Sequence, residues 1–276
     1  MGLSLRFQHL LKMTEHLPSL QKAIVLRRPS STIKSPYVAD VKLEDGREML
    51  CHTPGLGCSG LVEAGRQIFV SLNTKDSKSK TVCTATIAAC EDSTGSYTVG
   101  LQPLRSQKLA ASLLPSLAAD CEWKSEVTVE IPGFETTRLD YVGIRRADGK
   151  KVYVEVKNAM IAWDSSAPRA SRRAVFPDGY RKKKDEPVSP RAIKHAEALA
   201  ALRLQKETAA CILLFIVPRS DCHDGLLINP TDPLYCAAVS AAVRAGVVVR
   251  AFSSIYDEAK STAKISKEVP VFLDWR

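Results

Sequence analysis

The sequence has few aromatic residues, no C-x-x-C pair and no long apolar run. Phe, Trp and Tyr make up 6% of the 276 residues, so base stacking is not expected to dominate any nucleic-acid affinity. The eight cysteines follow neither metal-ligand nor small-scaffold spacing, which argues against zinc ribbons and disulfide frameworks. The apolar runs are too short to cross a bilayer, which argues against a membrane protein.

Cysteines outside such patterns usually act as small buried hydrophobes, and Cys211 and Cys236 lie in apolar segments. This usage predicts an intracellular, reducing compartment, with the cytoplasm favoured over the nucleus or mitochondrion. Residues 1–20 are basic and poor in acids, as transit peptides are, but contain little serine and arginine. We therefore favour an ordinary helical or disordered N-terminal extension over a targeting segment.

The charge is positive and unevenly distributed. The 39 Lys and Arg residues exceed the 30 Asp and Glu residues, which gives a net charge of +9. Residues 151–194 hold 11 basic and 5 acidic residues, so much of the excess lies there. A concentrated basic field favours a polyanionic partner, and nucleic acid is favoured over a membrane surface because no strongly amphipathic basic helix accompanies it. The alternative is a solvated basic loop.

Short strands separated by turns are typical of the first part of the chain. Five such strands within residues 21–101 predict a small β-barrel of the OB-fold type, which binds single-stranded nucleic acid in a basic groove. Arg27, Arg28 and Lys42 are candidate nucleic-acid contacts on it. The strands are expected at residues 23–28, 37–43, 47–52, 67–72 and 81–90.

Near residue 101 the pattern changes, which predicts a second domain over residues 102–276. Its expected elements are a helix at 105–114, a strand at 122–131, a hairpin at 138–157, a long irregular basic segment at 159–189, a helix from 190, a strand at 211–217, a helix at 233–245 and a strand at 247–252. This order predicts a mixed α/β sheet flanked by helices, and an α+β fold for the whole chain.

The hairpin groups charged side chains. Two alternating runs flank an Asp-Gly turn, and the period of two places Glu155 and Lys157 on one face, while Arg138 and Asp140 share a side on the other strand. Asp140 and Glu155 could hold Mg²⁺ or Mn²⁺ for phosphodiester hydrolysis, with Lys157 offsetting developing charge. From spacing alone we favour the alternative, solvated cross-strand pairs.

Other polar residues lie nearby in the sequence. Glu126 is a candidate accessory acid or an exposed charge at the edge of the sheet. Ser189 and Pro190 predict a helix start that presents Arg191, Lys194 and His195, which are candidate phosphate contacts. His195 is either a proton carrier or, as we favour for a lone helical histidine, a surface residue.

These segments together resemble a known family. The segments are Ala39-Asp40-Val41, Asp45-Gly46-Arg47-Glu48, Lys124-Ser125-Glu126-Val127, Arg138-Leu139-Asp140-Tyr141, Val154-Glu155-Val156-Lys157, Phe176-Pro177-Asp178, Arg191 with Lys194-His195, and Pro270-Val271. In this order and at these separations the chain resembles the sugar fermentation stimulation protein A family over about residues 21–273. The resemblance implies an OB-fold joined to a domain of the PD-(D/E)xK nuclease-like type.

The resemblance also implies roles for individual residues. It implies that Asp140 and Glu155 are metal ligands, that Lys157 is the catalytic lysine, that Glu126 is an accessory acid and that the protein binds DNA. The chain departs from the family pattern where Gly55-Leu56 replaces Asn-Thr, and where Ile193 replaces a glutamine.

Three functional hypotheses follow. The first is a DNA-binding protein with a metal-dependent phosphodiesterase site. The second is a non-catalytic DNA-binding or regulatory module that uses the nuclease-like fold for binding only. The third is a protein scaffold in which the basic segment binds acidic partners.

Overall fold

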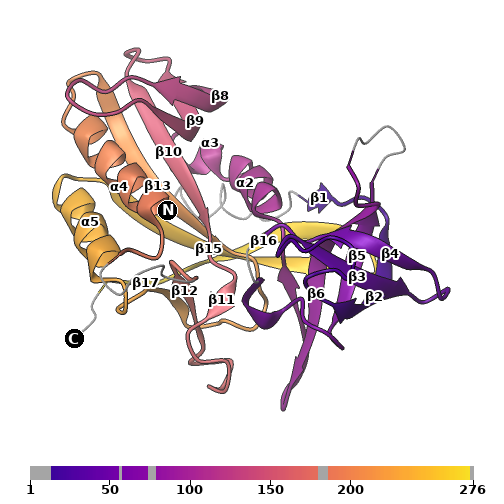
Figure 1. Ribbon diagram of the computed structural model, residues 1–276. Coiled ribbons are helices and arrows are strands. Elements are labelled where there is room, and N and C mark those ends of the chain that lie inside the picture. The colour runs from indigo at the N-terminus through magenta and orange to yellow at the C-terminus, as the bar shows by residue number, and fades with distance from the viewer. Residues whose placement is uncertain (1–13, 56–57, 74–78, 180–185, 274–276) are drawn as a thin grey trace.

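Sheet predominates in the mixed α/β fold of this chain. The computed structural model describes residues 14–55, 58–73, 79–179 and 186–273. Within this part of the chain, strands form a barrel-like sheet, a long twisted sheet flanked by helices and a small third sheet (Figure 1). None of the helices described there is long and apolar enough to span a membrane.

The first sheet closes on itself. Its strands run in the order β4-β3-β2-β5-β6-β7, and β4 also pairs with β6, so the first five strands form a closed barrel. All five strands expected in this region are present, whereas β7 was not expected. Small and β-branched side chains such as Ala23, Val25 and Val70 fill the interior. The strands are β2 (Leu20–Arg27), β3 (Val38–Leu43), β4 (Glu48–His52), β5 (Gln67–Leu72), β6 (Cys83–Asp92) and β7 (Gly95–Gly100); η1 (Cys58–Gly60) is a short 3-10 turn.

The second sheet has seven strands in the order β1-β16-β15-β13-β10-β9-β8. The central strands β10, β13 and β15 are parallel, and the outer pairings are antiparallel. The mixed sheet predicted from the order of elements is therefore confirmed. The helical or disordered extension expected over residues 1–20 is wrong for residues 14–16, because they pair with β16. The strands are β1 (Thr14–His16), β8 (Cys121–Val129), β9 (Thr137–Arg145), β10 (Lys151–Asn158), β13 (Thr208–Val217), β15 (Val248–Asp257) and β16 (Thr262–Val269).

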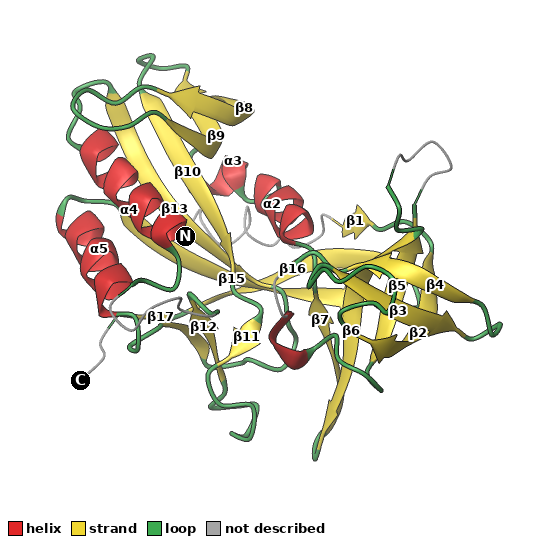
Figure 2. Ribbon diagram, in the orientation of Figure 1, coloured by secondary structure: helices red, strands yellow, loops and turns green. Residues whose placement is uncertain are grey.

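Helices cover both faces of this sheet (Figure 2). Helices α2 (Pro103–Ala111) and α3 (Leu114–Leu117) lie on one face, where Leu109 packs with Val152 and Val154. Helices α4 (Pro190–Arg203) and α5 (Pro233–Arg244) lie on the other, where Leu199 packs with Tyr153. The alternation along β10 is thus as expected: its valines face α2, and its tyrosine faces α4.

Two helix predictions differ in outcome. The start of α4 is confirmed, because Ser189 Oγ accepts the N–H of Ala192 at 3.3 Å and Pro190 is the first helical residue. The helix expected at 105–114 is confirmed over residues 105–111 as α2, but its expected end is wrong, because α2 stops at Ala111. A separate short helix, α3, begins at Leu114 with Pro115 in its first turn, where proline is tolerated, whereas inside a continuous helix it would break the hydrogen bonding.

The third sheet lies in part within the segment that was expected to be irregular. It has the order β11-β12-β14-β17, and β11 and β12 come from residues 159–189; residues 180–185 of this segment lie outside the described residues. Its strands are β11 (Ile161–Ala162), β12 (Arg173–Phe176), β14 (Gly225–Ile228) and β17 (Val271–Phe272).

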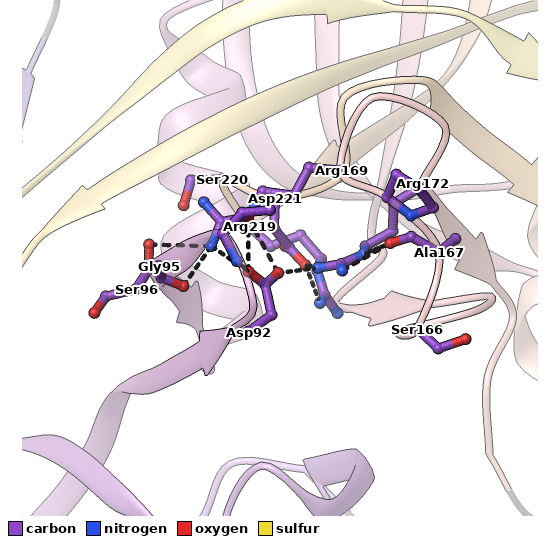
Figure 3. Close-up of polar contacts among 12 residues, drawn as sticks. Asp92, Gly95, Ser96, Ser166, Ala167, Arg169, Arg172, Arg219, Ser220 and Asp221 are labelled. Atoms are coloured by element: carbon purple, nitrogen blue, oxygen red, sulfur yellow. Dashed lines mark hydrogen bonds and ion pairs between the residues drawn. The ribbon is translucent and has the colours of Figure 1, made fainter.

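A network of ion pairs joins the barrel to this region (Figure 3). Asp92, at the end of β6, binds Arg169 and Arg172, each at 2.9 Å. Arg172 also binds Asp221 at 2.6 Å, and Arg219 binds the other oxygen of Asp221 at 2.7 Å. We call these five residues the junction cluster. Because Asp92 ends β6 while the other four residues follow β11 or β13, the cluster holds the β6–β7 hairpin against the loops after these strands.

Candidate active site

Two acidic side chains lie where strands β9 and β10 stop pairing. The antiparallel register extends to Tyr141 and Val154 and ends before Asp140 and Glu155. Asp140 Oδ2 then accepts the backbone N–H of Val156 at 2.7 Å. The carboxylate of Asp140 therefore replaces a backbone acceptor at the point where the strands diverge.

Glu155 is buried and lies in contact with two basic side chains. Lys157 Nζ donates to Glu155 Oε1 at 2.6 Å, His195 Nδ1 hydrogen-bonds to the same oxygen, and Nζ lies 2.9 Å from Nδ1. The predicted shared face of Glu155 and Lys157 is confirmed. The alternative of solvated pairs is wrong, because the side chains of Lys157 and Glu155 are only 11% and 4% exposed.

The second carboxylate oxygen of Glu155, Oε2, differs from Oε1 in its hydrogen bonding. Within the described part of the chain, Glu155 Oε2 is buried and has no hydrogen-bond partner. A buried carboxylate oxygen without a donor is costly, since it has lost its hydration without compensation. This oxygen therefore marks a position that a cation or a bound water would stabilise.

The two carboxylates have pKa values shifted in opposite directions. Burial, reinforced by the charge of Glu155, raises the pKa of Asp140 to about 6, against the opposing charges of Lys157 and Arg191. Burial also favours a higher pKa for Glu155, but the hydrogen bond with His195 and the charge of Lys157 outweigh it, so its pKa lies below the ordinary value. Glu155 thus stays ionised, while Asp140 takes up a proton near pH 6 unless a cation lies nearby.

The donor set suits a hard divalent cation. No group of three or more His, Cys, Asp or Glu side chains in the described ranges is arranged to hold a metal ion. Mg²⁺ and Mn²⁺ need only one or two carboxylates, since water and phosphate oxygens complete their coordination. Asp140 and Glu155, with the unpartnered Oε2, fit that requirement.

His195 is buried, although a lone helical histidine in the sequence favoured a surface position. It is 4% exposed and bonded to Glu155, so its interpretation as a surface residue is wrong. The helical period places it on the buried side of α4 beside Ala192 and Ala196. Burial leaves it little surface for contacting nucleic acid, and its structural partner is Glu155.

The remaining predicted residues near the site are more exposed. Arg191 is exposed at the start of α4, and Lys194 pairs with Glu135 at 2.6 Å. Glu126 and Arg138 are about half exposed and bind each other at 3.2 Å, across β8 and β9. Glu126 also has a left-handed backbone, with φ of 53°, which is uncommon for glutamate. Its role as an accessory acid stays a prediction.

The three predicted contacts on the barrel have different surroundings. Arg28 donates to the carbonyl oxygens of Pro36 and Gly55, at 2.8 and 2.6 Å, so it ties loops of the barrel together. Arg27 is 64% exposed beside Asp40, and Lys42 is exposed on β3. Arg27 and Lys42 are therefore available for a polyanion, while Arg28 is engaged within the barrel.

One polar residue of the site had no signal in the sequence. Gln107, on α2, donates from Nε2 to Asp140 Oδ1 at 3.0 Å. The two residues lie 33 positions apart, and an amide on a helix carries no spacing that points to a carboxylate on a distant strand. Only the packing of α2 on β9 and β10 brings them together.

The barrel-like sheet, the mixed sheet and the buried carboxylate–lysine cluster together define a mixed α/β protein with a candidate metal site. A model of the sugar fermentation stimulation protein RE domain matches residues 102–260. The sugar fermentation stimulation protein homolog of Alteromonas mediterranea is 30% identical over 252 residues, covering 88% of this chain and 94% of that protein. The homolog of Thioalkalivibrio sulfidiphilus is 31% identical, covering 86% and 90%.

The chain belongs to the sugar fermentation stimulation protein family. The SfsA structure of Pyrococcus furiosus in complex with Ca²⁺ has the same fold, with a TM-score of 0.68 at 20% identity, over 94% of this chain and 98% of that one. The two homologs named above are bacterial, which gives no support to a nuclear or mitochondrial location.

Proposed function

We propose that this chain is a DNA-binding protein whose residues Asp140, Glu155 and Lys157 form a divalent-metal-dependent phosphodiesterase site. The observation that carries the proposal is the buried, unpartnered Oε2 of Glu155 beside an aspartate whose pKa is raised to about 6. Both features are costly in the protein alone, and a divalent cation would offset both. The Ca²⁺ complex of the Pyrococcus furiosus relative supports binding of a hard cation by this fold.

The residues have separable roles in this proposal. Asp140 and Glu155 hold Mg²⁺ or Mn²⁺, which when bound polarises a phosphoryl group and lowers the pKa of a water molecule. Lys157 offsets the negative charge that develops on phosphate, and its contact with Glu155 fixes its ammonium group at the site. His195 holds Glu155 Oε1 and so leaves Oε2 for the cation.

Nucleic-acid binding in this proposal rests on exposed or half-buried basic residues. Arg191, Lys194 and Arg138 lie near the carboxylates in the fold, while Arg27 and Lys42 lie on the barrel. Such residues bind the phosphate backbone without reading sequence. We assign DNA, in preference to RNA, as the substrate. We also propose that residues 21–101 act as an OB-fold-like module and residues 102–276 as a PD-(D/E)xK-like domain.

The test incubates the purified full chain with single-stranded and duplex DNA and RNA, with Mg²⁺, with Mn²⁺ or with EDTA. Asp140→Asn and Glu155→Gln are the control variants, because each keeps the shape of the side chain and removes its charge. We expect cleavage of DNA that needs the divalent cation and is lost in both variants.

The alternative function has its own signature in the same experiment. A non-catalytic module would bind DNA with ordinary salt dependence, cleave no substrate with either cation, and bind DNA equally well or more tightly after Asp140→Asn. That result would reject the enzyme and keep the binding protein. Binding that is insensitive to salt would reject both and favour acidic protein partners.

A further inference from the structure

Helix α2 is bonded to both strands that carry the site. Tyr141 Oη donates to the backbone carbonyl of Gln107 at 2.8 Å, which ties the helix to β9. Ser106 Oγ donates to Asn158 Oδ1 at 2.6 Å, which ties it to β10 beside Lys157. The backbone of Gln107 is therefore fixed on both sides before its side chain is considered.

The start of the same helix is fixed both to the barrel and to β1 of the seven-stranded sheet. Gln102, the residue before α2, donates from Nε2 to Thr86 Oγ1 on β6 at 2.8 Å and to the carbonyl of Ala85 at 3.3 Å. Arg105 pairs with Glu15 at 2.7 Å, and both side chains are less than a fifth exposed. Helix α2 thus has little freedom to move relative to the site.

From this position Gln107 reaches the aspartate. Asp140 is held at both oxygens, by Gln107 Nε2 at Oδ1 and by the N–H of Val156 at Oδ2. The terminal torsion of aspartate has a broad energy minimum, so an aspartate held at one oxygen could still rotate. Each carboxylate oxygen has two lone pairs, so accepting one hydrogen bond leaves it able to bind a cation.

We infer that Gln107 is a positioning residue for the metal site: its side-chain amide holds Asp140 Oδ1 and so fixes the plane of the carboxylate that faces the cation. Gln107 acts through Asp140 and needs no contact with metal or substrate. The inference rests on the proposed role of Asp140 as a metal ligand. Hydrogen-bond partners of metal ligands commonly contribute ten- to a hundredfold in affinity.

The experiment measures binding of Mn²⁺ to the full chain by titration calorimetry, together with thermal unfolding in EDTA. Gln107→Met keeps the length of the side chain and removes the donor, and Gln107→Ala removes both length and donor. Gln205→Met makes the same chemical change in the loop after α4 and is the matched control. We expect Mn²⁺ affinity to fall about tenfold or more in both Gln107 variants and to be unchanged in the control.

The outcomes distinguish two roles for the Gln107 side chain: positioning Asp140 through a hydrogen bond, and packing only. Equal loss of affinity in Gln107→Met and Gln107→Ala, with Gln107→Met unfolding at the wild-type temperature, supports positioning. Wild-type affinity in Gln107→Met, or a lower unfolding temperature that accompanies its lower affinity, overturns the inference in favour of a packing role. Absence of Mn²⁺ binding by the wild-type chain would instead reject the proposed metal site itself.

Discussion

The chain contains two buried groups of charges, the junction cluster and the carboxylates with their lysine and histidine at the end of β10. Both remove charged groups from water: counted over whole residues, Arg172 and Asp221 are 3% and 0% exposed in the first, and Glu155 and His195 are 3% and 4% exposed in the second. Burial of charge alone therefore does not distinguish a structural cluster from a functional one.

The difference lies in how completely the charges are paired. In the junction cluster each aspartate binds two guanidinium groups, and the five residues leave no buried side-chain polar atom without a partner. The hydrogen bond from Arg169 holds the pKa of Asp92 well below its usual range, and the hydrogen bonds and charges of Arg219 and Arg172 outweigh burial at Asp221 and lower its pKa as well. At the site, one carboxylate oxygen has no donor and Asp140 has a raised pKa. The site thus differs from the junction cluster in combining an unpaired carboxylate oxygen with a neighbouring aspartate whose pKa is raised.

The largest expected effect concerns catalysis. Asp140→Asn and Glu155→Gln should each reduce Mg²⁺-dependent cleavage of DNA by several orders of magnitude, because the cation loses a charged ligand. Initial rates on a labelled DNA strand measure the effect. Asp92→Asn is the counterpart in the junction cluster, and its folded fraction should cleave at a rate close to that of the wild type. If Asp92→Asn loses as much cleavage activity as Asp140→Asn, the junction cluster is also needed for catalysis and does not serve structure alone.

The second effect concerns stability. Arg172→Met should lower the free energy of unfolding by about 3 kcal/mol, because Asp221 and Asp92 each lose a charge-assisted hydrogen bond while keeping their other guanidinium partner. Arg138→Met removes an exposed partner of Glu126 and should cost at most about 1 kcal/mol. Urea unfolding followed by circular dichroism checks both values. Equal losses would mean that the junction cluster does not differ from an ordinary surface pair.

The third effect is a dependence of stability on pH. The folded chain raises the pKa of Asp140 from 3.8 to about 6, so between these values it binds more protons than the unfolded chain. Its contribution is therefore favourable at low pH and is lost as the pH rises through about 6, by at most about 3 kcal/mol.

Thermal unfolding in EDTA between pH 4.5 and 7.5 measures this contribution as the difference between the wild type and Asp140→Asn. The loss of stability that the wild type shows with rising pH, relative to Asp140→Asn, should shrink on addition of Mn²⁺, because the cation favours the ionised carboxylate. Parallel pH profiles for the two proteins in EDTA would contradict the raised pKa.

The smallest effect concerns exposed charge. Lys42→Gln should weaken DNA binding a few-fold and reduce the slope of log affinity against log salt by about one, as expected for one lost phosphate contact. Lys150→Gln, in the turn between β9 and β10, makes the same change as a control. Fluorescence anisotropy at several salt concentrations provides the slopes. Identical slopes for Lys42→Gln and the wild type would contradict the proposed contact between Lys42 on the barrel and a DNA phosphate.

Features set by local spacing could be predicted from the sequence. The period of two placed Glu155 and Lys157 on one face, and the cap at Ser189 placed the start of α4. These depend on neighbouring residues along one strand or one helix turn. The barrel strands were found for the same reason, since alternation and turns mark each of them.

Features that depend on packing could not be predicted. The burial of His195 follows from how α4 lies on β10, and the bond from Gln107 to Asp140 joins two elements far apart in the chain. The bond between Arg172 and Asp92 spans 80 residues and has no local pattern. The short strands of the third sheet also lacked a signal, because two-residue strands such as β11 and β17 show no measurable alternation.

The pairing of β1 with β16 has a consequence for dissecting this protein. The chain contributes β1 to one edge of the seven-stranded sheet, then builds the barrel, and only afterwards returns with β8 at the opposite edge. A fragment that begins after the barrel therefore loses β1 and leaves the backbone of residues 262–264 of β16 unpaired. Exposed strand edges recruit other chains. Such a fragment should self-associate, whereas a fragment that keeps β1 through a short linker to α2 should remain monomeric.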